Sequence, residues 1–186
     1  MDEVFDPEQI LRVLGEHRVD YVVVGGVAVQ THGFIRATQD LDIVPAPDLA
    51  NLSRLGEALA ALGARLHRAA RPVDITDPQV LKRASLVPLL TIHGRLDLLN
   101  IESTAGLPSR YSELRERALE VRLDDTTVPV VALDDLIKMK KVAGRDIDTP
   151  DHALEAYARL RAAPVVPVRV RRGRAVVELT FRIARP

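Results

Sequence analysis

The sequence contains no cysteine and no tryptophan. The absence of cysteine excludes disulfide scaffolds, thiolate zinc sites and cysteine nucleophiles together. No two histidines are four residues apart, so a histidine zinc site on a helix is not expected either. His32 directly precedes Gly33, and we expect it to end a helix without a catalytic role. The five histidines are His17, His32, His67, His93 and His152.

An excess of charge of either sign is also missing, because 26 lysines and arginines balance 26 aspartates and glutamates. A net charge of zero provides no overall basic field to attract nucleic acid. With three Phe and three Tyr, stacking of bases on aromatic side chains is not expected. No apolar run approaches the roughly 20 residues that span a bilayer, and the acidic N-terminus does not resemble a signal peptide. We therefore expect a soluble, cytoplasmic protein with no membrane partner.

Helical and strand patterns alternate along the chain, which predicts an α+β (α/β mixed) fold with a small mixed sheet. The length of 186 residues suits one domain with a small extension. We expect a first domain over residues 1–164, with a core at about 19–131 and a C-terminal helical segment over 132–164. Residues 165–186 are predicted to form a basic β-hairpin, with six arginines against one glutamate.

Several element boundaries are predicted from the local pattern. A short helix is expected from about 27 to 32, and a longer one over 109–120. A further helix is expected to begin at 149–150, where threonine and proline suit its first positions. Residues 64–86 give a weaker pattern, from which we predict one short helix after Pro78.

Asp40 and Asp42 alternate along a strand predicted over 39–44, so both carboxylates face one side, roughly 7 Å apart. Leu41 and Ile43 then point to the opposite side, into the core. Two neighbouring carboxylates raise each other's pKa, and a divalent cation removes that cost. Hard oxygen ligands on a rigid strand suit Mg²⁺, with Mn²⁺ as the alternative ion.

Asp97 is a third carboxylate, flanked by apolar residues on another predicted strand. Three carboxylates can hold two metals about 4 Å apart, the geometry used for in-line phosphoryl displacement. Gly25 and Gly26 lie between a strand and a helix, where backbone N–H groups can approach a triphosphate. Each of these features has a simpler explanation: the alternating aspartates could lie on a solvated edge strand, and the two glycines could form a plain turn. Their order along the chain favours a site.

Lys140 falls in the middle of the apolar stripe of a helix predicted over 133–144. Such a lysine either extends its stem to solvent or is held at a polar site inside the protein. We favour the second interpretation, with Lys140 as an anchor for a nucleotide phosphate. The stripe consists of Leu133, Leu136, Ile137 and Gly144. A different, solvated face is expected to carry Lys138, Lys141 and Arg145.

The glycine pair followed by Asp-x-Asp on the next strand resembles the minimal nucleotidyltransferases of the DNA polymerase β superfamily. Residues 36–42, Arg-Ala-Thr-Gln-Asp-Leu-Asp, are similar to the Arg-x-Thr-x-Asp-Leu-Asp variant of the AbiEii-like group, which includes the MenT toxins. The Asp-Leu at 135–136, Lys140 and the following arginine and aspartates are similar to the same group. The resemblance extends over about residues 21–163, and it implies a polymerase β-like nucleotidyltransferase core.

The resemblance also implies roles for particular residues. Asp40, Asp42 and Asp97 are expected to bind metal and, with Lys140, to be catalytic. Gly26, often serine in relatives, is expected to contact phosphate through its backbone. Further candidate nucleotide-binding residues are Gly25, Arg36, Thr38, Lys140, Arg145 and Asp151. Arg36 and Thr38 are explained equally well as residues of a plain turn that contacts no ligand. Acids at a helix start, such as Asp148 and Asp151, are stabilised there without a ligand.

The implied activity is transfer of a nucleoside monophosphate from an NTP, such as ATP, to an acceptor hydroxyl. The resemblance favours the 3′ end of tRNA as acceptor, which makes the protein a toxin with a cognate antitoxin protein. The arginines of residues 169–174 suit contact with RNA backbone, although a solvated hairpin explains them equally well. The alternatives are a small-molecule (antibiotic) adenylyltransferase and an antitoxin that AMPylates its toxin.

Overall fold

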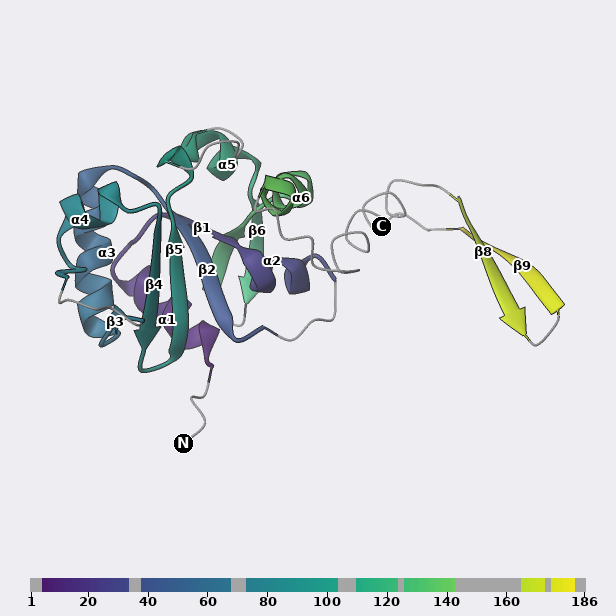
Figure 1. Cartoon of the computed structure of the whole chain (residues 1–186), viewed down its shortest axis with the longest axis horizontal. Coiled ribbons are helices and arrows are strands. Elements are labelled where there is room, and N and C mark those ends of the chain that lie inside the picture. Colours follow the sequence, from purple (N-terminus) through teal and green to yellow (C-terminus); the bar gives the residue numbers. More distant parts are fainter. Residues whose placement is uncertain are drawn as a thin grey trace. The chain divides into compact units, whose positions relative to one another are not determined.

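The computed structural model describes residues 5–33, 38–67, 73–103, 110–123, 126–142, 165–172 and 175–182. The chain divides into two units, Met1–Ala143 and Gly144–Pro186, and each is described by itself (Figure 1). The expected α+β class is confirmed, because helices accompany a mixed sheet in the first unit. The domain boundaries predicted from the sequence stay predictions.

The first unit is organised around a seven-stranded sheet with the order β3-β4-β5-β2-β1-β7-β6. The pairs β2–β5 and β1–β7 are parallel, and the other neighbours are antiparallel. The sheet is therefore mixed, as predicted. Its strands are β1 Tyr21–Val24, β2 Asp40–Pro45, β3 Arg65–Leu66, β4 Leu86–Thr91, β5 Gly94–Leu99, β6 Leu119–Leu123 and β7 Thr126–Val130.

Six α-helices accompany the sheet in the described part of this unit. Asp6 and Asp48 cap the first and third of them by accepting backbone hydrogen bonds, at 3.1 Å from Gln9 N and 2.9 Å from Asn51 N. The helices α1 and α3 contact each other, and α1 lies behind the sheet as Figure 1 is viewed. The six are α1 Pro7–Glu16, α2 Gly25–Thr31, α3 Leu49–Ala61, α4 Pro78–Arg83, α5 Tyr111–Arg117 and α6 Leu133–Val142.

The central strands present two different faces. Leu41 and Ile43 on β2 are fully buried, and Leu96 on β5 is buried in the same way. The residues that alternate with them and point to the other face, Asp40 and Asp42 on β2 and Arg95 and Asp97 on β5, are only half-buried, whereas Val44 at the far end of β2 is buried. The sequence alternation on β2 therefore separates a core face from an acidic face, as expected.

Two helix predictions were wrong at their ends. The helix α2 begins at Gly25, two residues before the predicted start, because the chain turns directly from β1 into the helix at this glycine. The helix predicted over 109–120 ends at Arg117 as α5. The chain then becomes extended, since Leu119 and Glu120 pair with Val130 and Pro129 on β7. Strand pairing here overrides a local helical pattern.

Other predictions of elements have different outcomes. The short helix after Pro78 is confirmed as α4, whereas the short strand β3 was not predicted. A single 3-10 turn, Ile101–Ser103, was also not predicted. The helix expected from 149–150 lies outside the described residues. Within the described ranges, none of the helices is both long and apolar enough to cross a membrane.

The second unit contains the predicted terminal hairpin. Its strands, β8 Val165–Arg172 and β9 Ala175–Arg182, pair antiparallel over their whole length. Arg169 is opposite Glu178 in this register. The hairpin is confirmed as an element, and its proposed contact with RNA stays a prediction.

Candidate active site

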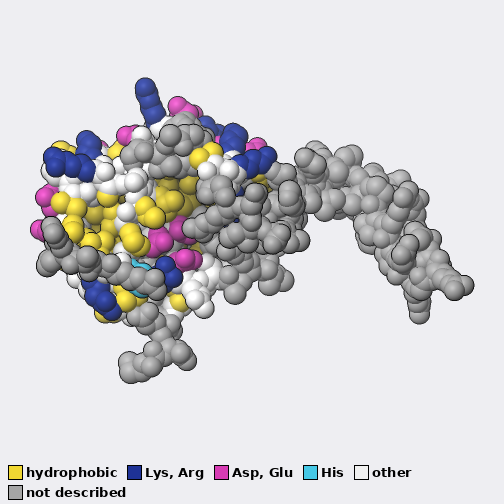
Figure 2. All heavy atoms as spheres, viewed as in Figure 1, with side chains coloured by type: hydrophobic (Ala, Val, Ile, Leu, Met, Phe, Trp, Pro, Cys, Tyr) yellow, Lys and Arg dark blue, Asp and Glu magenta, His cyan; other side chains and the backbone are white. Residues whose placement is uncertain are grey.

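Two of the predicted carboxylates lie side by side on neighbouring strands. In the parallel pairing of β2 with β5, Asp42 is in register with Asp97, and Asp40 is in register with Arg95. Residues in register on adjacent strands project to the same face, with the strands about 4.8 Å apart. Figure 2 shows acidic side chains gathered over β2 and β5, with apolar side chains beside them. The sheet thus brings together three aspartates that are up to 57 positions apart in the sequence (97 − 40).

The glycine turn packs directly against this acidic face. Gly25 has a φ of +66°, a left-handed conformation that glycine adopts without strain. A Cβ atom at Gly25 would overlap Asp42 Oδ2 and would lie 2.5 Å from Asp42 Cγ. The antiparallel pairing of Val24 with Asp42 produces this close approach. Glycine is therefore required at position 25 both by conformation and by the carboxylate beside it.

Thr38 lies between the second glycine and the first carboxylate. A Cβ atom at Gly26 would overlap Thr38 Oγ1 and would lie 2.9 Å from Thr38 Cβ. The same hydroxyl donates to Asp40 Oδ1 at 2.9 Å, and it lies 3.2 Å from Asp40 O. The sequence marked Thr38 as a nucleotide-binding candidate, and the structure adds a contact with Asp40 that the sequence did not reveal.

Lys140 is half-buried on α6, a helix that contacts α2. The buried face of α6 consists of Asp135, Leu136 and Met139, so Lys140 lies at the edge of this face. Lys138 and Lys141 are exposed, as predicted. Gly144, the predicted end of the stripe, lies outside the described residues. The position of Lys140 is compatible with an inward-reaching ammonium, and its role stays a prediction.

Asp135 anchors α6 and was not given this role from the sequence. Its side chain is 2% exposed, and it accepts from Arg117 Nε at 2.7 Å and from Lys138 Nζ at 3.4 Å. The hydrogen bond with Asp135 raises the pKa of Arg117. This burial could not be predicted from the sequence, because an acid in the first turn of a helix is stabilised there whether or not it is buried.

His32 ends the helix α2, as predicted. The side chain is buried at the end of α2, and its Nε2 lies 2.8 Å from Val131 O. This contact joins α2 to the segment that follows β7. The remaining candidates Arg36, Arg145, Asp148 and Asp151 lie outside the described residues, so their roles stay predictions.

The carboxylates fit a divalent cation in chemistry and in strand placement. Three hard oxygen donors share one face of two adjacent strands, and the missing Cβ of Gly25 leaves Asp42 its space. Among the described residues, no three His, Asp or Glu side chains are arranged as a closed metal site. The three aspartates thus lie on suitable positions of β2 and β5 for a metal site, and rotation of their side chains would have to bring the carboxylate oxygens together.

The architecture has counterparts among solved structures. The lincosamide antibiotic adenylyltransferase LnuA, bound to lincomycin, matches with a TM-score of 0.53 and 19% identity over 85% of this chain and 98% of its own. ANT(2'')-Ia, in complex with adenylyl-2''-tobramycin, matches with a TM-score of 0.51 and 15% identity over 84% of this chain and 97% of its own. No family model and no curated protein sequence matches the chain. At these identities the likeness shows a nucleotidyltransferase fold, as the resemblance implied.

Proposed function

We propose that this protein is a metal-dependent nucleotidyltransferase that transfers a nucleoside monophosphate from an NTP to an acceptor hydroxyl. The observation that carries the proposal is the register of Asp42 with Asp97, next to a glycine turn that packs on Asp42. Acidic side chains on one face suit a metal that neutralises phosphate charge. Backbone N–H groups at a glycine turn suit the phosphates themselves.

In the proposed site, Asp40, Asp42 and Asp97 hold Mg²⁺ or Mn²⁺. A divalent ion, when bound, stabilises charge on phosphate oxygens and lowers the pKa of a nearby hydroxyl. Asp97 accepts the proton of the acceptor hydroxyl. The acceptor oxygen forms a bond to the α-phosphorus, the bond from that phosphorus to the bridging oxygen breaks, and pyrophosphate leaves.

The triphosphate is held by the remaining candidates. The amides of Gly25 and Gly26 and the ammonium of Lys140 provide positive partners for phosphate oxygens. The proposed nucleotide site is completed by Arg36, Thr38, Arg145 and Asp151.

For the acceptor, we favour the 3′ end of tRNA in the cytoplasm. Transfer of a nucleotide to that end blocks translation, so the protein would act as a toxin and require a cognate antitoxin. Support comes from the Arg-x-Thr-x-Asp-Leu-Asp string and from the arginine-rich hairpin β8–β9. Arginine pairs well with the phosphates of RNA.

The second candidate acceptor is an antibiotic hydroxyl. This alternative is favoured by the likeness in fold to LnuA and ANT(2'')-Ia, which are solved with lincomycin and with adenylyl-2''-tobramycin. A small-molecule enzyme of this kind would bind ATP and would not require RNA.

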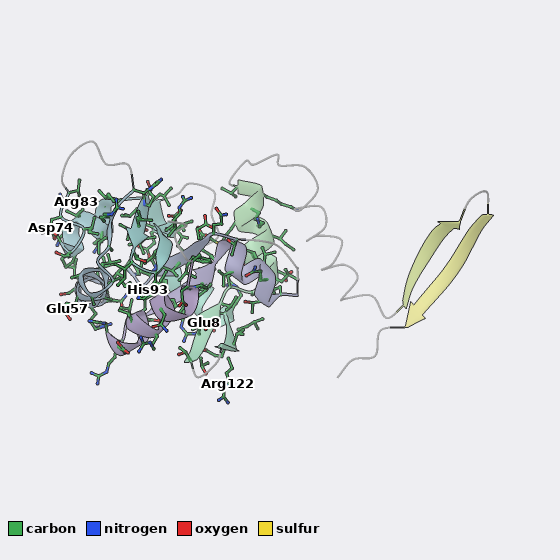
Figure 3. The ribbon with its side chains drawn as sticks, turned by 90° about the horizontal axis from the view of Figure 1, so that it is seen from below. Glu8, Glu57, Asp74, Arg83, His93 and Arg122 are labelled. Atoms are coloured by element: carbon green, nitrogen blue, oxygen red, sulfur yellow. The ribbon has the colours of Figure 1, made fainter. Side chains whose placement is uncertain are left out.

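The test is incubation of the purified protein with Mg²⁺ and each α-labelled NTP in turn. Total cellular RNA, lincomycin and tobramycin serve as separate acceptors, and Asp42→Asn is the inactive variant. Glu57→Gln is the matched control, because Glu57 is an exposed carboxylate on α3 (Figure 3). Label in tRNA-sized RNA, lost only in Asp42→Asn, supports the toxin. Label in an antibiotic supports the second candidate, and equal labelling by Asp42→Asn overturns the proposed site.

A further inference from the structure

The hydroxyl of Thr38 joins two parts of the site that the sequence treats separately. Thr38 Oγ1 donates to Asp40 Oδ1 at 2.9 Å, and it occupies the space beside Gly26 where a Cβ atom would be. Thr38 precedes β2 by two residues and is half-buried. One hydroxyl therefore lies between the start of α2 and the first carboxylate of β2.

A carboxylate that binds metal must be held in one orientation. An aspartate side chain rotates about two bonds, and its oxygens accept several hydrogen bonds, so one accepted bond leaves room for a metal. Threonine is stiff because it branches at Cβ. A hydroxyl fixed in this way restricts Asp40 more than a solvent molecule would. Loss of such a partner of a metal-binding carboxylate typically lowers metal affinity about 10–100-fold.

We infer that Thr38 is a positioning residue, which orients Asp40 for the metal, and that Gly26 lacks a side chain because the Thr38 hydroxyl needs its space. The inference rests on the proposed function, since it assumes that Asp40 binds a divalent ion. It assigns Thr38 a role toward the carboxylate in addition to the nucleotide contact predicted from the sequence. It also gives the second glycine a reason that does not involve phosphate.

The first experiment compares Thr38→Val with Thr38→Ser. Valine keeps the shape and removes the hydroxyl, whereas serine keeps the hydroxyl. Binding of Mn²⁺ is measured by electron paramagnetic resonance in the presence of a non-hydrolysable ATP analogue. We expect Thr38→Val to bind Mn²⁺ about 10–100-fold more weakly and Thr38→Ser to remain within about threefold of the wild type. In Thr38→Val the apparent KM for Mn²⁺ should rise more than the KM for NTP, because the lost hydroxyl orients a ligand of the metal; a rise confined to the KM for NTP would contradict the positioning role.

The second experiment reaches the same hydroxyl from the other side. A methyl group at position 26 would lie 2.9 Å from Thr38 Cβ, so Gly26→Ala displaces Thr38. We expect Gly26→Ala to weaken Mn²⁺ binding as Thr38→Val does. Because both variants break one contact, the double variant should be little worse than either single variant. Fully additive losses would overturn the link between Gly26 and Thr38.

The outcomes separate this inference from the proposed function. If Asp40→Asn loses Mn²⁺ binding and Thr38→Val does not, the positioning role is wrong and the proposed function stands. If the wild type and Asp40→Asn bind Mn²⁺ equally, the proposed function itself fails. Thr38→Ala replaces Thr38→Val if the valine variant does not fold. A Thr38→Ala variant with full Mn²⁺ affinity would contradict the inference equally.

Discussion

Gly25 brings the glycine turn into close contact with the carboxylate of Asp42, so its replacement tests this contact directly. Its φ is +66°, and a Cβ atom there would overlap the side chain of Asp42. An L-residue in the left-handed region costs about 1–2 kcal/mol, and the overlap adds to this cost. The position therefore tests conformation and site geometry together.

We predict that Gly25→Ala lowers the free energy of unfolding by at least about 1 kcal/mol and abolishes nucleotide transfer. The matched control is Gly15→Ala, because Gly15 lies at an exposed helical position where a Cβ atom would meet nothing within 4 Å apart from its chain neighbours and the backbone of its own helix. Alanine there should stabilise α1 by about 0.5–1 kcal/mol. Chemical denaturation and a transfer assay measure both variants. Equal stability of the two variants would contradict the close contact with Asp42.

The residues of the candidate site could be nominated from the sequence, but their contacts could not. Alternation along β2 placed Asp40 and Asp42 on one face, and local pattern alone was enough for that. The register of Asp42 with Asp97 depends on how β2 and β5 pair, and the contact of Thr38 with Gly26 depends on how the chain returns to the turn. Such long-range contacts leave no periodic signal in a single sequence.

At the scale of elements, one buried asparagine joins α3 to the residue before β1 and to the residue after β2. Asn51 is fully buried, and its side chain bonds with Asp20 N at 2.7 Å, Asp20 O at 2.9 Å and Ala46 O at 3.0 Å. Asp20 Oδ1 also accepts from Tyr111 OH at 2.8 Å. Burial, and then this hydrogen bond, raise the pKa of Tyr111. The network connects α3 and α5 to the start of β1.

We predict that Asn51→Ala lowers the free energy of unfolding by about 2–4 kcal/mol, because three backbone groups lose their partner. Asn100→Ala is the control, since Asn100 also bonds to backbone groups but in an exposed place, at 3.0 Å from Lys82 O and 3.1 Å from Glu102 N. We expect Asn100→Ala to lower the free energy of unfolding by less than about 1 kcal/mol. Urea denaturation compares the two, and an equal loss would refute the anchoring role of Asn51.

Local chemistry determines several ends of the helices. Aspartates at 6 and 48 mark helix starts, and Gly63, with a φ of +57°, follows the end of α3. Errors occurred where tertiary pairing decides. The start of β6 took residues from a predicted helix, and β3, a strand of two residues, is too short for any period to appear.

The whole molecule has a net charge of zero, so its total charge does not attract RNA. Any attraction would have to come from a local cluster of positive charge. The hairpin β8–β9 carries arginines 169, 171 and 172 on one strand. If tRNA is the acceptor, these arginines neutralise phosphates, and binding weakens as salt increases.

We predict that changing Arg169, Arg171 and Arg172 to glutamine lowers the slope of log affinity against log salt by up to about 3. The control changes three exposed arginines of the first unit to glutamine, Arg12, Arg83 and Arg122, the last two of which are labelled in Figure 3. Both triple variants alter the net charge equally. Filter binding of total tRNA over a salt series is the measurement. Equal slopes for the two variants would show that the hairpin makes no specific contribution.

The central claim is that the acidic face of β2 and β5 binds an NTP together with a divalent ion. Isothermal titration calorimetry of each NTP, with and without Mg²⁺, tests it in the wild type, Asp42→Asn and Glu57→Gln. We predict Mg²⁺-dependent binding of at least one NTP to the wild type, unchanged in Glu57→Gln and at least about 10-fold weaker in Asp42→Asn. Binding to Asp42→Asn as tight as to the wild type, or binding of no NTP at all, would contradict the account.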